Sequence, residues 1–336
     1  MTKKALVVTS IANDQHPILQ RFAEECVLRN IPFYLMGDTK SPENFNLKGC
    51  NYYSIQAQEE SGFALAEKLP VKHYSRKNIG YLLAIQQGAE TIIESDDDNI
   101  PLSNFWEQRE RFQTGDKIAN QGWINIFNYF STEHIWPRGY PIELVQQQQE
   151  LQIISLQEAV DCPIHMALVQ KNPDVDAIYR MTQKLPIYFE EDKKLIAGKG
   201  SWSPFNSQNT VWFKDAYPLM YLPSYCSFRM TDIWRSFIAQ RIAWENGWNI
   251  CFHSPSVIHD RNEAILINDF KQEVSGYLNN SMIADELDKL SLKSGVGQLG
   301  DNLLKCYELF IKLNLIEEQE LELVQAWISD LKHLSR

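Results

Sequence analysis

Three consecutive carboxylates, Asp96, Asp97 and Asp98, directly follow a short apolar run over 91–93 that predicts a buried strand. Open α/β sheets bind ligands at the carboxyl ends of their strands, which is where this cluster falls. Because side chains alternate along a strand, we expect Asp96 and Asp98 to project to one side and Asp97 to the other. Magnesium is usually held by one or two carboxylates together with substrate phosphates, and Mn²⁺ takes the same oxygen donors.

The cluster therefore predicts a site for Mn²⁺ or Mg²⁺ and a nucleotide diphosphate. We expect Asp98 to bind the metal directly, Asp96 to reach the ribose or a metal-bound water, and Asp97 to face the nucleotide sugar. Three adjacent acids repel one another unless a cation neutralises them. The alternative is an acidic turn that caps the segment beginning at Pro101.

Arg76, Lys77 and Asn78 stand at the start of a helix predicted over 78–87. Cations are unfavourable beside the positive end of a helix dipole, so their placement suggests a bound anion. Amides at the helix N-terminus, with an arginine or a lysine, can hold a diphosphate or order a base. The alternative is that these are solvated surface charges.

Polar residues also follow the first two predicted strands. Thr9 and Asn13 come after the first strand and Asp38 after the second, where they can meet the base and the ribose of a nucleotide. Gly37 and Asp38 are equally typical of a tight turn.

Arg138 and Asp232 are the candidate catalytic residues. Arg138 lies between Trp136 and Tyr140 in a rigid aromatic loop that can aim a guanidinium at phosphate, although stacking on either ring is the alternative. Asp232 lies in the first turn of a helix predicted over 231–246, with Thr231 as its N-cap. A carboxylate there can remove the proton of an acceptor hydroxyl, or it can simply stabilise the helix dipole.

Asp174 and Asp176 form a second pair of carboxylates, with Arg180 nearby. Such groups can recognise sugar hydroxyls. Pro173 followed by Asp174 is also typical of an ordinary turn.

The elements that must position these residues alternate in type over the first 100 positions. Apolar runs over 5–10, 32–36 and 51–55 predict strands, and helices are predicted between them, beginning at Pro17. This order predicts an α/β domain with a mostly parallel sheet and helices on both faces. We expect a nucleotide-binding half over 1–100, a mixed acceptor half over 101–264, and a helical region over 265–336 that can form a homo-oligomer or partner surface.

Composition excludes several classes of protein. The net charge of −11 over 336 residues argues against nucleic-acid binding, which needs a basic face. Six cysteines without a Cys-x-x-Cys pair favour reduced thiols and a cytoplasmic location. The apolar run over 5–12 is too short for a signal peptide, and no window approaches the ~18 apolar residues of a membrane span, so we expect no integral membrane segment.

The segment 74–89, read together with 96–99, resembles the STELLO family of glycosyltransferases. Three later stretches, 172–180, 204–210 and 227–235, resemble the same family in the same order, so the similarity runs over about residues 5–262. It implies a GT-A type fold and a nucleotide sugar bound over the metal, and it adds Asn209 and Arg229 to the nucleotide-sugar site.

The resemblance also implies a late histidine in the metal shell. His259 is the better placed candidate and His253 is its rival. Arg138 to Pro141 is similar, more faintly, to the plant reversibly glycosylated polypeptides, which are nucleotide-arabinose mutases. No membrane anchor precedes the motifs, so a Golgi-type role is not expected.

Together these patterns predict a cytoplasmic, metal-dependent glycosyltransferase that moves a sugar from a nucleoside diphosphate, UDP above all, to a hydroxyl acceptor, in surface glycan synthesis. A nucleotide-sugar mutase is the first alternative, and a mutase changes its donor without a second substrate. A non-catalytic nucleotide-sugar-binding protein is the second. A nucleotidyltransferase is disfavoured because the loop over 11–14 lacks glycines and basic residues.

Overall fold

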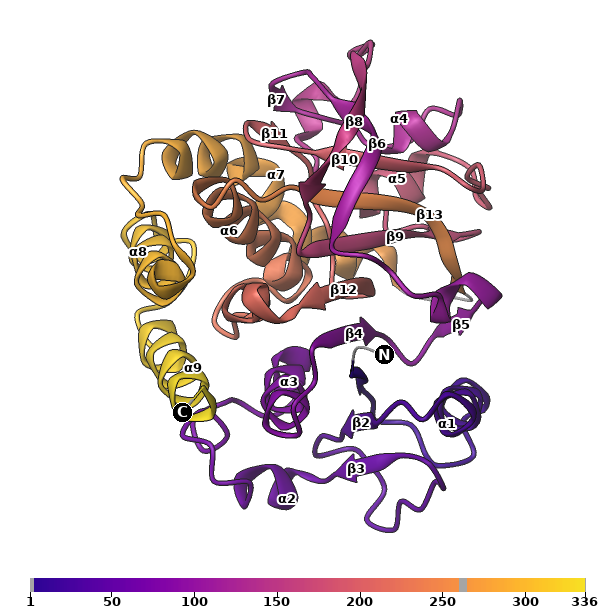
Figure 1. Cartoon of the computed structure of the whole chain (residues 1–336), viewed down its shortest axis with the longest axis vertical. Coiled ribbons are helices and arrows are strands. Elements are labelled where there is room, and N and C mark those ends of the chain that lie inside the picture. The colour runs from indigo at the N-terminus through magenta and orange to yellow at the C-terminus, as the bar shows by residue number, and fades with distance from the viewer. Residues whose placement is uncertain (1–2, 260–264, 336) are drawn as a thin grey trace.

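A computed structural model describes residues 3–259 and 265–335. Within these residues, eleven strands form one sheet, and ten of them follow the order β3-β2-β1-β4-β12-β9-β13-β10-β6-β8 while β5 pairs with β13 (Figure 1). Their bounds are β1 (Lys4–Thr9), β2 (Phe33–Met36), β3 (Asn51–Tyr53), β4 (Thr91–Ser95), β5 (Asn99–Pro101), β6 (Phe112–Ile118), β8 (Ile153–Asp161), β9 (Ile164–Gln170), β10 (Lys194–Ala197), β12 (Asn209–Phe213) and β13 (Ile250–His259). A separate parallel pair consists of β7 (Gly122–Trp123) and β11 (Ser201–Trp202).

The first four strands of this order, β3, β2, β1 and β4, are parallel to one another. Helix α1 (Pro17–Arg29) covers one face of them and α3 (Lys77–Gln86) covers the other (Figure 1). Alternation along β1 explains the two layers, because Leu6 and Val8 are buried in the core under α1, whereas Ala5 and Val7 are buried in the core under α3. Both faces are covered, as parallel strands require.

The second half of the sheet is mixed. Strand β12 is antiparallel to both of its neighbours, β4 and β9, and β13 returns to the parallel direction beside β9. Beyond β13, β10 pairs with it in the antiparallel direction, and the β6–β8 pair completes the edge. The predicted α/β class is confirmed, and the large central sheet flanked by helices is consistent with a GT-A type fold.

Helix α6 (Thr231–Glu245) is buried along nearly its whole length. It begins where the sequence predicted, at Thr231. Its N-cap residue is Met230, and no side chain makes a capping hydrogen bond. The expectation that Thr231 caps the helix was therefore wrong. The short 3-10 helix Phe228–Met230 leads directly into α6 and occupies the position where a cap would stand.

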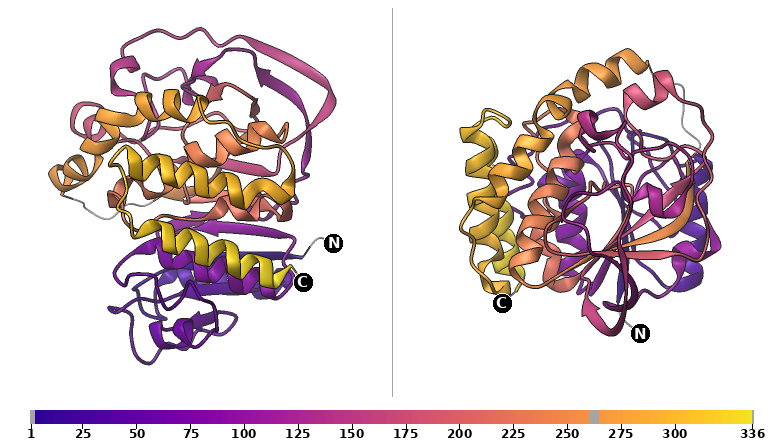
Figure 2. Two further views of the ribbon diagram at one scale, coloured as in Figure 1. Left: turned by 90° about the vertical axis from the view of Figure 1, so that its left-hand side faces the viewer. Right: turned by 90° about the horizontal axis from the view of Figure 1, so that it is seen from above.

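Three long helices follow the sheet: α7 (Leu266–Asp288), α8 (Leu299–Lys312) and α9 (Glu320–Leu334). Helix α8 packs on α6 and α9 packs on α3, so both lie along one side of the molecule (Figure 2). Tyr307 and Trp327 from these helices are buried in the same core as α3 and α6. The predicted domain boundary at 264 lies outside the described residues.

The short helices are α2 (Ile55–Glu59), α4 (Phe127–Phe130) and α5 (Ala177–Thr182). In the described part of the chain no helix combines the length and the apolar composition that a bilayer crossing needs.

Candidate active site

A cavity of about 380 Å³ opens at the carboxyl ends of β1, β2 and β4. This is the edge at which α/β sheets bind ligands. Its lining includes four residues that the sequence singled out, Thr9, Asp38, Arg76 and Asp97. Asn13 does not line it: this residue is exposed on the loop after β1 and its side chain accepts from the amide of Gln15 at 3.0 Å.

Asp38 binds the backbone of the segment 72–73, which forms one wall of the cavity. One carboxylate oxygen accepts from the amide of Lys72 at 2.8 Å, and the other accepts from the amide of His73 at 3.1 Å. Both of those residues line the cavity. Asp38 therefore fixes a loop that faces the ligand space, in addition to facing that space itself.

Aromatic rings flank the same wall. His73 stacks on Tyr74 with ring centroids 5.4 Å apart, and Phe228 meets the two rings edge-on at 5.1 and 4.8 Å. Burial lowers the pKa of His73 to about 4, so the ring is neutral at physiological pH. These three rings give the cavity an apolar surface on which a base can stack.

Arg76 is buried beneath the cavity, with 1% of its surface exposed. Its Nε donates to Gln58 at 2.7 Å and its Nη1 to the carbonyl of Leu69 at 3.0 Å. Its Nη2 has no hydrogen-bond partner among the described residues. A buried donor without an acceptor is costly, so this group is available to an acceptor on a ligand.

The three aspartates lie in a turn, because β4 ends at Ser95. The expectation that strand alternation sorts them into two sides was wrong for this reason. Each has a different partner instead. Asp96 accepts from Lys77 at 2.7 Å, Asp97 from the hydroxyl of Ser10, and Asp98 lies 2.9 Å from His259 Nε2.

Burial raises the pKa of Asp96 to about 6; Lys77 opposes this shift and Asp98 adds to it. Burial also raises the pKa of Asp97, and the hydrogen bond from Ser10 opposes it. Burial is the main cause of both shifts and the neighbouring carboxylates add to it, so a nearby cation would favour the ionised form of each.

His259 comes to this turn from the end of β13. Its Nδ1 lies 3.0 Å from the carbonyl of Asn172 and donates there, and the Nε2–H of the charged ring donates to Asp98 at 2.9 Å. Burial disfavours the charged ring, but the hydrogen bond and the charge of Asp98 outweigh it and raise the pKa of His259. A histidine held through its other nitrogen is the usual arrangement of a metal ligand.

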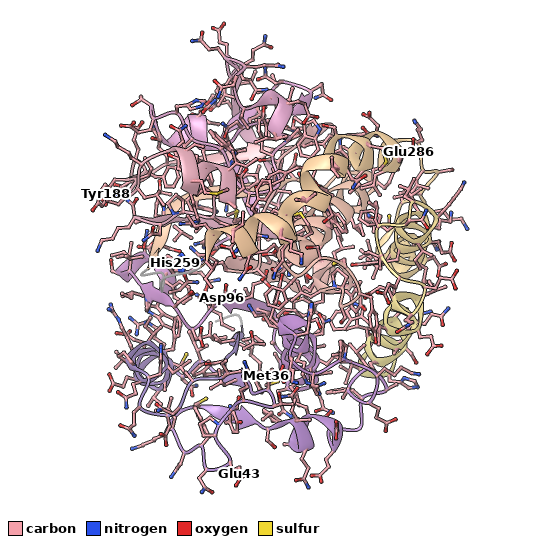
Figure 3. All side chains as sticks on the ribbon, turned by 180° about the vertical axis from the view of Figure 1, so that it is seen from behind. Met36, Glu43, Asp96, Tyr188, His259 and Glu286 are labelled. Carbon is pink, nitrogen blue, oxygen red and sulfur yellow. The ribbon has the colours of Figure 1, made fainter. Side chains whose placement is uncertain are left out.

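Asp98 and His259 are the two residues of this turn that could hold a metal together with oxygens of a ligand. Among the described residues, donor atoms of Asp96, Asp98 and His259 do not gather into a closed group of three. His253, the rival, lies elsewhere, with its Nε2 2.9 Å from His165. In Figure 3, the labelled Asp96 and His259 lie near each other at about mid-height, between the upper and lower parts of the molecule.

Arg138 forms a buried ion-pair network with two acids. Its Nε and Nη2 donate to Asp174 at 2.8 and 2.9 Å, and its Nη1 and Nη2 each donate to Asp232 at 3.0 Å. Gly139, with φ of +92°, lets the loop pass close to Ile233, where a Cβ would clash.

The two acids hold the pKa of Arg138 above its usual range against the effect of burial. Arg138 also holds the pKa of Asp174 low.

Ser207 joins this network to the aspartate turn. Its amide donates to Asp232 at 3.2 Å, and its carbonyl accepts from Lys77 at 3.2 Å. On the other side, the amide of Asp232 donates to the hydroxyl of Tyr74 at 3.2 Å, and Tyr74 lines the cavity. The candidate base, the acidic turn and the cavity are thus connected through single residues.

Four of the remaining predicted residues use their side chains in contacts with other residues of the chain. Asn78 exchanges two hydrogen bonds with the backbone of Leu222, both at 2.9 Å. Asn209 bonds Leu168 and Ser256, and Asp176 caps α5 through the amide of Tyr179 at 2.7 Å. Arg229 pairs with Glu273 on α7 at 2.7 Å.

Arg180 lies near the segment that carries Asp174, because its Nη2 donates to the carbonyl of Pro173 at 2.9 Å. Sequence reasoning missed Ser10, Asn172 and Ser207, which hold Asp97, His259 and Asp232 respectively. Ser10 was accessible to that reasoning as the residue after the first strand. Ser207 acts through backbone atoms, which leave no signal in residue type, whereas Asn172 holds His259 through its carbonyl and through its side-chain amide, which donates to the carbonyl of His259 at 3.3 Å.

The described geometry is an α/β fold, consistent with the GT-A type, with an acidic turn and a nearby histidine at the ligand edge of its sheet. The family model of STELLO glycosyltransferases matches residues 229–336. The chain is 27% identical over 320 residues to "Probable glycosyltransferase STELLO2" and 26% identical to "Probable glycosyltransferase STELLO1", both from Arabidopsis thaliana. The resemblance to the STELLO family is thereby confirmed.

These matches cover 88% of this chain but 41% and 40% of the two relatives, so the chain spans less than half the length of the curated proteins it matches. Among solved structures, a "Crystal Structure of a Mycobacterial Protein" aligns with a TM-score of 0.44 and 8% identity, covering 84% of this chain and 75% of that one.

Proposed function

We propose that this chain is a metal-dependent glycosyltransferase that moves a sugar from a nucleoside diphosphate sugar to a hydroxyl acceptor. UDP is the nucleotide that we expect in the donor. One observation carries the proposal: the cavity between β1, β2 and β4 is bordered by the same aspartate turn that meets His259. The similarity to the STELLO glycosyltransferases supports the reaction class.

The base and ribose occupy the cavity, where Asp38 and the rings of Tyr74 and Phe228 face them. The free Nη2 of Arg76 donates to a carbonyl of the base. The diphosphate then extends toward the aspartate turn, where Asp98 and His259 hold Mn²⁺ or Mg²⁺. Bound there, the metal would supply positive charge against the negative charge that develops on the leaving diphosphate.

Asp232 acts as the base on the acceptor hydroxyl. Its Oδ2 already accepts from Arg138 and from the amide of Ser207, whereas for Oδ1 the contacts of the described residues give one donor, Arg138. A carboxylate oxygen has two lone pairs, so Oδ1 retains room for the acceptor proton. Arg138 and Asp174 orient this carboxylate.

The test is release of nucleoside diphosphate from a panel of UDP-sugars and GDP-sugars with Mn²⁺, with and without candidate hydroxyl acceptors. We expect turnover that depends on the acceptor and falls at least about 100-fold in Asp98→Asn. Asp14→Asn is the matched control, since Asp14 lies on the loop after β1 outside the cavity lining. Donor conversion that needs no acceptor, or turnover that Asp98→Asn leaves intact, contradicts the proposal.

A further inference from the structure

Three side chains with metal-binding donors meet on the central sheet, away from the aspartate turn. They are His165 on β9, with Cys251 and His253 on β13, and their donor atoms all lie within 4.8 Å of one another. Cys251 stands directly opposite His165 in the parallel register, and His253 follows two residues later on the same face of β13. The register of β9 and β13 therefore brings the three side chains together.

The hydrogen bonds of the two imidazoles suit a bound ion. His165 Nε2 lies 2.8 Å from the carbonyl of Cys162, so Nε2 carries the proton and Nδ1 turns its lone pair toward His253. Such a carbonyl partner is typical of a metal-bound histidine. His165 Nδ1 and His253 Nε2 are 2.9 Å apart. Two nitrogens bound to one ion at ~2.0 Å are held about 3.3–3.5 Å apart, so a small separation of the rings makes room.

The protonation states of the two imidazoles also suit a bound ion. Burial lowers the pKa of His165 to about 3 and that of His253 well below its usual value, so both rings are in the neutral form that binds metals. Burial raises the pKa of Cys251 to about 12, while the positive charges of Arg109 and Lys194 act in the opposite direction. A bound metal displaces the remaining thiol proton.

The surrounding charges decide which ion fits. Arg109 Nη1 is buried without a hydrogen-bond partner among the described residues, and Lys194, opposite His253, donates to Gln113 at 2.7 Å. A divalent ion with one thiolate adds a positive charge beside these two cations, whereas a monovalent ion with one thiolate adds none. Thiolate and imidazole ligands are those that soft monovalent copper prefers.

We propose that His165, Cys251 and His253 form a three-coordinate site for Cu⁺. The ion binds His165 Nδ1, His253 Nε2 and the Cys251 sulfur; the thiol proton leaves to solvent, and the His253 proton moves from Nε2 to Nδ1. No oxidation or reduction takes place. His253 is partly exposed while the other two ligands are buried, so the ion enters from the His253 side.

The experiment titrates the whole chain, without oxygen, with Cu⁺ delivered from a chromogenic chelator, and Zn²⁺ is tested in parallel. We expect one Cu⁺ per chain, withdrawn from the chelator, and affinity at least about tenfold weaker in Cys251→Ser and in His253→Gln. Cys26→Ser is the matched control because Cys26 is an equally buried thiol on α1. It should bind copper like the parent.

Three outcomes overturn the site: no copper withdrawn from the chelator, copper retained equally by Cys251→Ser, or tighter binding of Zn²⁺ than of Cu⁺. His253→Gln changes a partly exposed position, so it keeps the test decisive if Cys251→Ser fails to fold. Retained copper binding in a folded His253→Gln variant also overturns it.

Discussion

Arg138 and Asp232 are 94 positions apart in the sequence, yet the guanidinium and the carboxylate face each other through two hydrogen bonds of 3.0 Å. Asp174 takes the remaining side of the same guanidinium. One arginine thus pairs with two carboxylates, of which Asp232 is buried and Asp174 is partly exposed. Under the proposed function, this geometry gives Arg138 the role of positioning Asp232.

Replacement of Arg138 by lysine should separate turnover from nucleotide binding. A lysine ammonium cannot span two carboxylates in the planar geometry that a guanidinium provides. We expect kcat to fall at least about 100-fold while the Kd for the diphosphate changes little, because Arg138 is absent from the cavity lining. Turnover kinetics and calorimetry measure the two quantities.

Arg111→Lys is the matched control for this change. Arg111 also bridges two aspartates, Asp161 and Asp215, but at the start of β6. Equal losses of turnover in both variants would show that Arg138 acts only through general stability.

The Asp38→Asn variant should weaken nucleotide binding. Its amide nitrogen would meet a backbone N–H of the loop that Asp38 now holds through Lys72 and His73. We expect the Kd for UDP to rise about 10- to 100-fold, since a hydrogen bond to a charged group contributes about 1.5–3 kcal/mol. Calorimetric titration with UDP checks this, and an unchanged Kd would remove Asp38 from the site.

Asp176 should make stability depend on pH. Burial raises its pKa from 3.8 to about 6, so its contribution to stability is present below pH 3.8 and is lost as pH rises through about 6. Asp176→Asn removes the charge and keeps the oxygen that caps α5, but its amide nitrogen then faces the indole N–H of Trp136, a loss that does not vary with pH. We expect the variant to gain on the order of 2 kcal/mol relative to the parent between pH 4 and pH 7.

Urea denaturation at several pH values measures this difference. A difference between the variant and the parent that stays constant across this range would contradict a raised pKa at Asp176.

Arg235 and Glu94 form a buried ion pair that also carries a prediction. The side chains are 1% and 0% exposed, and the guanidinium bonds Glu94 at 2.8 and 2.9 Å. Arg235→Met leaves Glu94 buried without its counter-ion, so we expect a loss of about 3–5 kcal/mol in the free energy of unfolding.

The exposed pair Arg29 and Glu25 gives the control. Arg29→Met should cost no more than about 1 kcal/mol, because both side chains of this pair are about a third exposed. Denaturant unfolding of both variants distinguishes the buried pair from the exposed one; equal losses would contradict the burial argument.

Much of the nucleotide-binding half was predictable because its signals are local. Apolar runs gave β1 and β2, Pro17 marked the first turn of α1, and the acids after β4 marked the ligand edge. The pairing of Asp98 with His259 was reached only through the family resemblance, and the structure places these two side chains together.

What sequence reasoning could not give was the partner of each side chain. Lys77 was expected at a phosphate, and it lies buried between Asp96 and two backbone carbonyls. Asn78 was treated as part of the same anion site, but long-range packing brings Leu222 to its amide. Contacts between positions 144 apart depend on the tertiary fold and have no periodic signal in one sequence.

The central claim is that the aspartate turn binds a nucleoside diphosphate through a metal. A thermal-shift panel of UDP, GDP, CDP, ADP and CMP, each with and without Mn²⁺, tests it most directly. A ligand present at 100 times its Kd adds about 2.7 kcal/mol of stability. We predict a manganese-dependent shift with one diphosphate, UDP, that Asp98→Asn abolishes. The absence of any shift, or an equal shift without Mn²⁺ and in Asp98→Asn, would contradict the claim.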